Sequence, residues 1–180
     1  RDKDAVTSTL LACEIAARAR AEGSSFYKEL MRCYVDFGCY RERLVSLVRR
    51  GMDGAEEIGR MMREFRENPP TSLDGSPIIR IDDYQESTSR DTRKGTTDPI
   101  DLPRSNVLIF TTGDGMRLAA RPSGTEPKIK FYVSVSGEIG SPAEYPEAKK
   151  QLESKMDRVL GLTALSDLLP VDVLNQAMGD

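Results

Sequence analysis

Apolar and polar residues alternate in one long stretch of the chain, which is the pattern of strands that bury a single face. In residues 129–135 the apolar positions are Ile129, Phe131, Val133 and Val135. Residues 116–121 alternate in the same way, which turns Arg121 away from the core face. Residues 106–112 form another apolar run, and Gly113-Asp114-Gly115 after it is a typical hairpin turn. We therefore predict three consecutive strands and expect the last two to be antiparallel neighbours.

Two segments at the start of the chain have apolar residues at helical spacing. The first helix is expected from Asp4, its N-cap, to about Glu22. Its apolar positions are Val6, Leu10, Leu11, Cys13, Ile15 and Ala17. The second helix is expected after Ser24-Ser25 and ends at Gly38. Its predicted buried side comprises Leu30, Cys33 or Tyr34, and Phe37.

A strand, a helix and a second strand are predicted next. The strands are Arg43–Arg50 and Ile78–Tyr84. Between them, Asp53 and Glu56 have the spacing of a capping box that starts a helix, and Asn68-Pro69-Pro70 stops it. The apolar stripe of this helix is formed by Ile58, Met61 or Met62, and Phe65.

Three further segments complete the prediction. Residues 85–101 are polar and lack periodicity, which indicates a long loop or an irregular hairpin. Ser141-Pro142-Ala143-Glu144 is a typical helix start, and Gly161 can end that helix. Its buried face is predicted to contain Ala148, Leu152, Met156 and Val159. Residues 162–180 are expected to form one or two short helices without an assigned function.

The order of these elements predicts an α+β fold: a mostly antiparallel sheet with helices on one face, in the order β-α-β-β-β-β-α, preceded by a helical hairpin. A two-helix hairpin cannot bury both of its apolar faces alone. We therefore predict two domains, with residues 1–38 as the helical end of a preceding domain and residues 39–180 as the C-terminal domain.

Composition narrows the possible functions. The chain has 180 residues with a formal net charge of −3 and 6% aromatic residues, which argues against a nucleic-acid-binding protein. It contains no His, so any acid–base chemistry falls to other side chains. Cys13, Cys33 and Cys39 lack zinc-site spacing and are expected to be reduced, mostly buried thiols of a cytoplasmic protein. No membrane segment or signal peptide is expected, and the initial Arg1 suggests a piece of a longer protein.

The segment Arg121-Pro122-Ser123-Gly124-Thr125-Glu126-Pro127-Lys128, between the last two strands, has the chemistry of an anion site. Arg121 offers a planar fork of donors, Ser123 and Thr125 offer hydroxyls, and Lys128 adds charge at the rim. Gly124 is expected to adopt a positive φ so that backbone N–H groups can converge. The alternative is an ordinary Pro/Gly/Ser/Thr turn. The segment is not a Walker A sequence, because it lacks the Gly-Lys-Ser/Thr ending and precedes a strand.

The sequence RPSGTEPKIKFY, from Arg121 to Tyr132, closely resembles the phosphate-binding loop in the last domain of the α-D-phosphohexomutases, the phosphoglucomutase/phosphomannomutase family. The resemblance implies a TATA-binding-protein-like domain. It also implies that Arg121, Ser123, Gly124, Thr125 and Lys128 bind the substrate phosphate that is not transferred. Glu126 would then hold the loop through Arg121 or Lys128. The stretches REFRENPPTSLDGSPIIRIDDY and LPRSNVLIFTTGDGMRLAARPSGTEPK are similar to the long branch of the family, which includes phosphopentomutase-like proteins.

The first residues, Arg1-Asp2-Lys3-Asp4, resemble the string that ends the sugar-binding domain of the same family. That resemblance implies that Lys3 lies near the active-site cleft, with a catalytic role as a cleft-lining residue. The alternative for Asp2 and Asp4 is a charged helix cap.

The family resemblance implies an isomerase that moves a phosphoryl group between the 1- and 6-hydroxyls of a hexose. A phosphoserine and Mg²⁺ serve this transfer, which passes through a glucose 1,6-bisphosphate-type intermediate. The chain has no phosphoserine loop, Asp-rich metal loop or Glu-Glu-Ser sugar loop, so it is expected to bind no metal and to be inactive alone. Its expected partners are the sugar phosphate and the remaining domains of the same polypeptide, without nucleic acid or membrane. The alternatives are another sugar phosphate mutase or bisphosphate synthase of the family, a stand-alone anion-binding module, or a purely structural domain.

Overall fold

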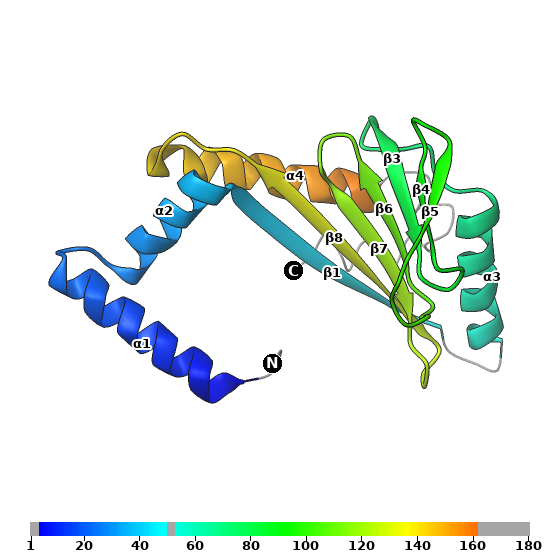
Figure 1. Cartoon of the computed structure of the whole chain (residues 1–180), viewed down its shortest axis with the longest axis horizontal. Helices are drawn as coiled ribbons and strands as arrows, with labels where there is room; N and C mark the ends of the chain where they lie inside the picture. The colour runs from blue at the N-terminus through cyan, green and yellow to red at the C-terminus, as the bar shows by residue number, and fades with distance from the viewer. Residues whose placement is uncertain (1–3, 50–52, 162–180) are drawn as a thin grey trace. The chain divides into compact units, whose positions relative to one another are not determined.

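The computed structural model describes residues 4–49 and 53–161 (Figure 1). It divides into two compact units: residues 1–40 with 137–150, and residues 41–136 with the residues from Gln151 onward. The unit boundaries fall inside strand β1 (Cys39–Val48) and helix α4 (Tyr145–Gly161). The division into domains 1–38 and 39–180 stays a prediction, and the short helices predicted in residues 162–180 lie outside the described residues.

The first unit contains the two predicted helices, α1 (Ala5–Ala21) and α2 (Phe26–Phe37). The Asp4 carboxylate accepts a hydrogen bond from the Thr7 N–H at 2.9 Å, and the Ser25 hydroxyl accepts one from the Lys28 N–H at 3.2 Å. Gly38 follows α2 with a φ of +93°, a conformation that glycine adopts without strain. The predicted caps and the predicted stop at Gly38 are therefore confirmed.

The predicted buried side of α2 is wrong at Leu30, Cys33 and Phe37, whereas Tyr34, its other candidate, is half-buried. Met31 is the buried residue of this helix, whereas Phe37 is 75% exposed and Leu30 and Cys33 are also exposed. The reason lies in what the helix packs against within its own unit. The rings of Tyr34 and Tyr145 stack with centroids 5.3 Å apart, and α2 contacts the 3₁₀ turn η1 (Pro142–Glu144).

The apolar stripe of α1 is present but is not buried within the first unit. Ala19 is the buried residue of this helix, while Val6 is 74% exposed and Leu10 is 66% exposed. The expectation of mostly buried thiols is also wrong, because Cys13 and Cys33 are exposed and Cys39 is the buried one. All three cysteines are free.

The second unit is built on an eight-stranded sheet in the order β1-β8-β7-β6-β3-β4-β5, with β2 paired to β3 (Figure 1). Its other strands are β2 (Ser72–Leu73), β3 (Ser76–Asp83), β4 (Thr88–Asp91), β5 (Thr96–Pro99), β6 (Leu108–Thr112), β7 (Arg117–Pro122) and β8 (Lys128–Gly137). The pairings from β2 through β8 are antiparallel. The predicted α+β class is therefore confirmed, with β4 and β5 forming a hairpin in the polar segment 85–101.

Helix α3 (Gly54–Glu67) and helix α4 cover one face of this sheet. Phe65 of α3 packs against Phe110 of β6 and Phe131 of β8, with ring centroids 5.9 and 6.1 Å apart. The buried residues of α3 and α4 are Gly54, Ile58, Met61, Met62, Phe65, Leu152, Met156, Val159 and Leu160. The alternation along β7 and β8 buries one face and leaves the other open, as the sequence pattern predicts.

Two predicted helix starts differ in detail. Asp53 has helical dihedral angles (φ −86°, ψ −7°) and its side chain makes no capping hydrogen bond, so the expected capping box with Glu56 is wrong. Ser141 precedes the 3₁₀ turn η1, and Glu144 accepts hydrogen bonds from the Ser141 hydroxyl at 2.9 Å and the Gly140 N–H at 3.0 Å. A short 3₁₀ turn therefore leads into α4.

Charged pairs fix α4 over the sheet within the second unit. Arg41 and Arg43 of β1 pair with Glu153 and Asp157 of α4. In addition, Arg158 of α4 makes two hydrogen bonds, at 2.7 and 2.9 Å, to the Asp74 carboxylate in the β2–β3 turn. Partly exposed pairs of this kind contribute little stability one by one, but together they fix the position of the helix along the strands.

Candidate functional site: the anion loop

The anion loop, residues 123–127, connects β7 to β8 and is closed by backbone hydrogen bonds. Arg121 lies opposite Lys130 in the register of the two strands. The Ser123 N–H donates to the Lys128 carbonyl at 2.8 Å, and the Lys128 N–H donates to the Glu126 carbonyl at 2.7 Å. The predicted placement of this segment between antiparallel neighbours is therefore confirmed.

A hollow of about 300 Å³ lies at the anion loop. It is lined by Arg121, Pro122, Ser123, Gly124, Thr125, Glu126, Lys128 and Lys130. All five predicted phosphate-binding residues thus line one hollow. Since Arg121 and Thr125 are exposed and the hollow is lined mainly by polar groups, a soluble anion could reach it directly.

The conformation expected for Gly124 is wrong, because its φ is not in the left-handed region. The chain reverses over five residues closed by two backbone hydrogen bonds, so no single residue has to turn sharply. A Cβ built on Gly124 would meet no atom within 4 Å. The glycine therefore leaves its backbone uncovered on the loop surface, where a ligand can approach it closely.

Glu126 and Lys128 form an ion pair at the rim of the hollow. The hydrogen bond and the charge of Lys128 lower the pKa of the Glu126 carboxyl, and the charge of Lys130 lowers it further. Of the two partners expected for Glu126, the structure selects Lys128. Part of the positive charge of Lys128 is therefore balanced within the loop itself.

Arg121 and Lys130 are the two cations of the hollow without an ion-pair partner among the residues that the structure describes. Their cross-strand register places both on the open face of the sheet. Sequence reasoning left Lys130 out of the candidate site, although the strict alternation of β8 already placed it on the same face as Arg121. Lys3, the other candidate site residue, lies outside the described residues.

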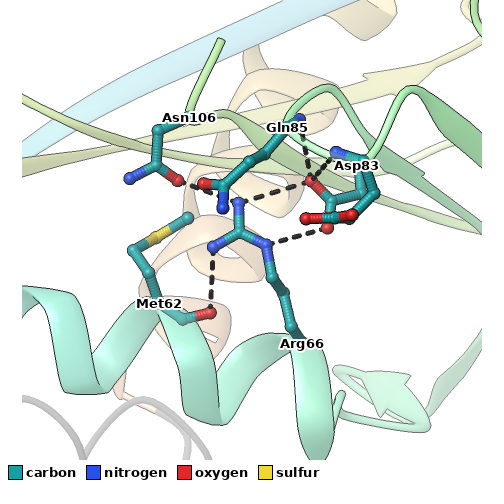
Figure 2. A network of polar contacts seen from close by, with 6 residues as sticks. Met62, Arg66, Asp83, Gln85 and Asn106 are labelled. Carbon is teal, nitrogen blue, oxygen red and sulfur yellow. Dashed lines mark hydrogen bonds and ion pairs between the residues drawn. The ribbon is translucent and has the colours of Figure 1, made fainter. Parts of the chain in front are cut away.

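Asp83, at the end of β3, is the centre of a second polar cluster that sequence reasoning missed (Figure 2). Asp83 is 8% exposed and accepts hydrogen bonds from Arg66 Nε at 2.8 Å and Nη2 at 3.3 Å. Arg66 Nη2 also donates to Asn106 Oδ1 at 2.8 Å, and Nη1 donates to the Met62 carbonyl at 3.4 Å. The Gln85 N–H adds a bond to Asp83 at 3.0 Å. The available sequence signal was the pair of aspartates that ends an apolar strand.

Neither a metal centre nor a membrane span is found in residues 4–49 and 53–161. No group of three or more Cys, Asp or Glu side chains there is arranged to hold a metal ion. No helix in the same residues has the length and apolar character that crossing a membrane requires.

Comparison with known proteins places the anion loop in a family. Residues 78–138 match the family model of the phosphoglucomutase/phosphomannomutase C-terminal domain. The chain is 39% identical over 135 residues to a phosphoglucomutase from Staphylococcus aureus strain MRSA252, and 38% identical to that from strain USA300. Each alignment covers 75% of this chain and 24% of the relative, so the chain spans about a quarter of the length of these relatives.

Among solved structures, the chain is similar to the open form of the exocytosis-sensitive phosphoprotein pp63/parafusin from Paramecium, a phosphoglucomutase. That match has 11% identity and a TM-score of 0.38, and it covers 75% of this chain and 22% of the other. Assignment therefore depends on the sequence matches, in which the family model includes the anion loop and the strands on both sides of it. The chain belongs to the phosphoglucomutase/phosphomannomutase family and contains its C-terminal domain.

Proposed function

We propose that the chain is the phosphate-binding part of a phosphohexomutase-type enzyme, which interconverts hexose 1-phosphate and hexose 6-phosphate by phosphoryl transfer. The anion loop binds the phosphate group that is not transferred. The observation that carries this proposal is the hollow lined by Arg121, Ser123, Gly124, Thr125 and Lys128, within a chain of this family.

The charges of the hollow suit a phosphate dianion. Arg121 offers two parallel N–H donors to a pair of phosphate oxygens. Lys130, opposite it in the register, supplies a second positive charge and forms no ion pair with a described residue. Ser123 and Thr125 add hydroxyl and backbone donors, and the uncovered backbone at Gly124 lets an oxygen approach closely. Lys128 contributes less charge than expected because Glu126 pairs with it.

Binding the remote phosphate contributes to catalysis by positioning. Contacts to a group that does not react fix the orientation of the sugar, so that its other end meets the reacting groups. In this proposal the bisphosphorylated intermediate, such as glucose 1,6-bisphosphate, binds in two orientations. Contacts restricted to a phosphate group allow both.

The reacting groups would belong to the remaining domains of the polypeptide. We assign the phosphoserine and the Mg²⁺ to those domains and derive no step through the metal, because residues 4–49 and 53–161 offer no ligand cluster for it. Lys3 stays a proposed cleft-lining residue. A phosphopentomutase or a bisphosphate synthase of the same family is the alternative, because the loop contacts phosphate and not the sugar.

Titration with glucose 6-phosphate tests the proposal. Saturating shifts of the Ser123, Gly124 and Thr125 amide signals in NMR spectra are expected for the unmodified chain. Arg121→Gln should weaken binding about tenfold or more, because it removes a charge-assisted bidentate contact.

Arg117→Gln is the matched control, because Arg117 is exposed on the same face of β7, four residues earlier. It should bind like the unmodified chain. Equal affinity for the Arg121 variant and the control would contradict the assignment of the anion loop.

A further inference from the structure

A second hollow, of about 180 Å³, lies on the helix-covered face of the sheet and shares no lining residue with the anion loop. We call it the edge pocket. The register explains how it forms, since Ile81, Arg90 and Thr97 lie side by side on β3, β4 and β5, and Asp83 lies beside Thr88 in the next row. The C-terminal end of α3 supplies Phe65 and Arg66.

The floor of the edge pocket is apolar. Phe65, Ile81 and Leu108 line it, and they are 3%, 8% and 1% exposed. Pro69, which follows α3, adds an apolar wall. Because these side chains are largely buried, the apolar body of a ligand would cover only a small apolar surface there, and the gain from that contact would be modest.

Positive charge remains at the mouth of the edge pocket. Arg66 is held by Asp83, Asn106 and the Met62 carbonyl, so its charge is balanced by a carboxylate (Figure 2). The Arg90 side chain has no hydrogen-bond or ion-pair partner in the part of the chain that the structure describes. It is therefore the one lining cation available to a ligand.

Beside Arg90, the Thr88 and Thr97 side chains line the same pocket. Neither hydroxyl makes a hydrogen bond to a described residue. Hydroxyl groups can donate to the same oxygens that an arginine binds. The polar side of the pocket thus presents one balanced arginine, one unbalanced arginine and two hydroxyls.

We propose that the edge pocket binds a small monocarboxylate with a compact apolar body. The carboxylate pairs with Arg90 through two parallel N–H···O bonds and accepts from a threonine hydroxyl, while the body rests on Phe65 and Leu108. A cavity of about 150 Å³ is known to hold benzene, so a pocket of 180 Å³ accommodates a body of ring size. A dianion fits less well, because a single unbalanced cation stands beside an apolar floor.

Sodium benzoate is the probe, and benzamide is its neutral isostere. In NMR titrations of the whole 180-residue chain, benzoate should bind with a Kd of about a millimolar and shift the amide signals of Thr88, Arg90 and Thr97. Benzamide should bind about tenfold more weakly. Arg90→Gln should weaken benzoate binding about tenfold and abolish the preference for benzoate over benzamide, and Arg90→Lys should restore part of it.

Arg117→Gln, which removes an exposed arginine from the open face, should leave benzoate binding unchanged. The proposal is overturned if benzoate does not shift the Thr88, Arg90 and Thr97 signals, or if Arg90→Gln binds it like the unmodified chain. Shifts confined to Ser123–Thr125 would also overturn it, because the carboxylate would then occupy the anion loop. The affinity of Arg90→Gln for glucose 6-phosphate separates the two sites. It should equal that of the unmodified chain, because the substitution leaves the anion loop intact.

Discussion

At the scale of single residues, the ion pair of Glu126 with Lys128 decides the charge that the anion loop offers. A carboxylate at the rim repels a phosphate, and it also balances the nearest lysine. The pair is partly exposed, so its own contribution to loop stability is small. The net effect of Glu126 on anion affinity should therefore be unfavourable.

Glu126→Gln should tighten the binding of glucose 6-phosphate about threefold at low salt, because it removes the repulsion and frees Lys128. Dissociation constants from calorimetry at low and high ionic strength measure this effect. Glu42→Gln removes a negative charge from β1 and is the control, with no expected change. Weaker binding by the Glu126 variant would mean that the carboxylate orders the loop more than it repels the ligand.

Sequence reasoning succeeded at this scale where one rule decides the outcome. Strand alternation alone turns Arg121 to the open face, and the structure agrees. The conformation of Gly124 and the choice between Arg121 and Lys128 as partner of Glu126 depend on how a five-residue loop closes. No pattern of residue types determines how the loop closes. The conformation of Gly124 was therefore predicted wrongly, and the partner of Glu126 was left undecided.

At the scale of elements, apolar periodicity predicted the strands and helices that bury a face. Helix α3 and strands β7 and β8 follow this rule. The sequence did not decide between a loop and a hairpin for β4 and β5, because the residues of these edge strands are polar on both sides. The buried side of α2 was predicted wrongly at Leu30 and Phe37, because the helix packs through Met31 and through Tyr34, which stacks on Tyr145 far away in the sequence.

The packing of α3 on the sheet makes a stability prediction. Phe65→Ala should lower the free energy of unfolding by about 3–5 kcal/mol, because it leaves a cavity between Phe110 and Phe131. Urea denaturation followed by circular dichroism measures the change. Phe37→Ala is the matched control at a side chain that is 75% exposed, and it should cost little. Similar losses for both variants would contradict the packing of Phe65 against Phe110 and Phe131.

The turn between β6 and β7 makes a pH prediction. Partial burial raises the pKa of Asp114, but hydrogen bonds from Lys155, Thr112 and Ser76 and the charge of Lys155 outweigh it and lower the pKa from 3.8 to about 2. A lowered carboxyl pKa stabilises the folded state above the unfolded pKa, and that stabilisation is lost as the pH falls through the folded one. The contribution of Asp114 is therefore lost between about pH 4 and pH 2.

In Lys155→Gln, Tm should decrease less steeply between pH 5 and pH 2 than in the unmodified chain. The corresponding difference in the free energy of unfolding should be less than about 1 kcal/mol, because the pair is partly exposed. Thermal melts across this range measure the slope. Lys28→Gln, at an exposed lysine of α2, should keep the original slope. An unchanged slope in the Lys155 variant would show that the pair does not lower the Asp114 pKa.

At the scale of the whole molecule, the proposed function requires more than this chain. The family and the α+β class were predictable because a long, unusual sequence string coincides with a regular strand pattern. The purified chain should bind sugar phosphate and should not convert glucose 1-phosphate to glucose 6-phosphate. A coupled assay with a complete phosphoglucomutase as the positive control checks this. Turnover by the chain would contradict the proposal that the reacting groups belong to the remaining domains.

The N–H of Arg49, just after β1, donates to the Pro127 carbonyl of the anion loop at 2.9 Å. Because this bond uses only the main chain, substitution of the Arg49 side chain leaves the donor in place. Proline is the exception, since it has no N–H to donate. The anchoring of the anion loop would therefore leave no conserved side chain at position 49 of related proteins. The anchoring bond by itself excludes only proline at that position, and any preference for arginine there would come from its separate ion pair with Glu57.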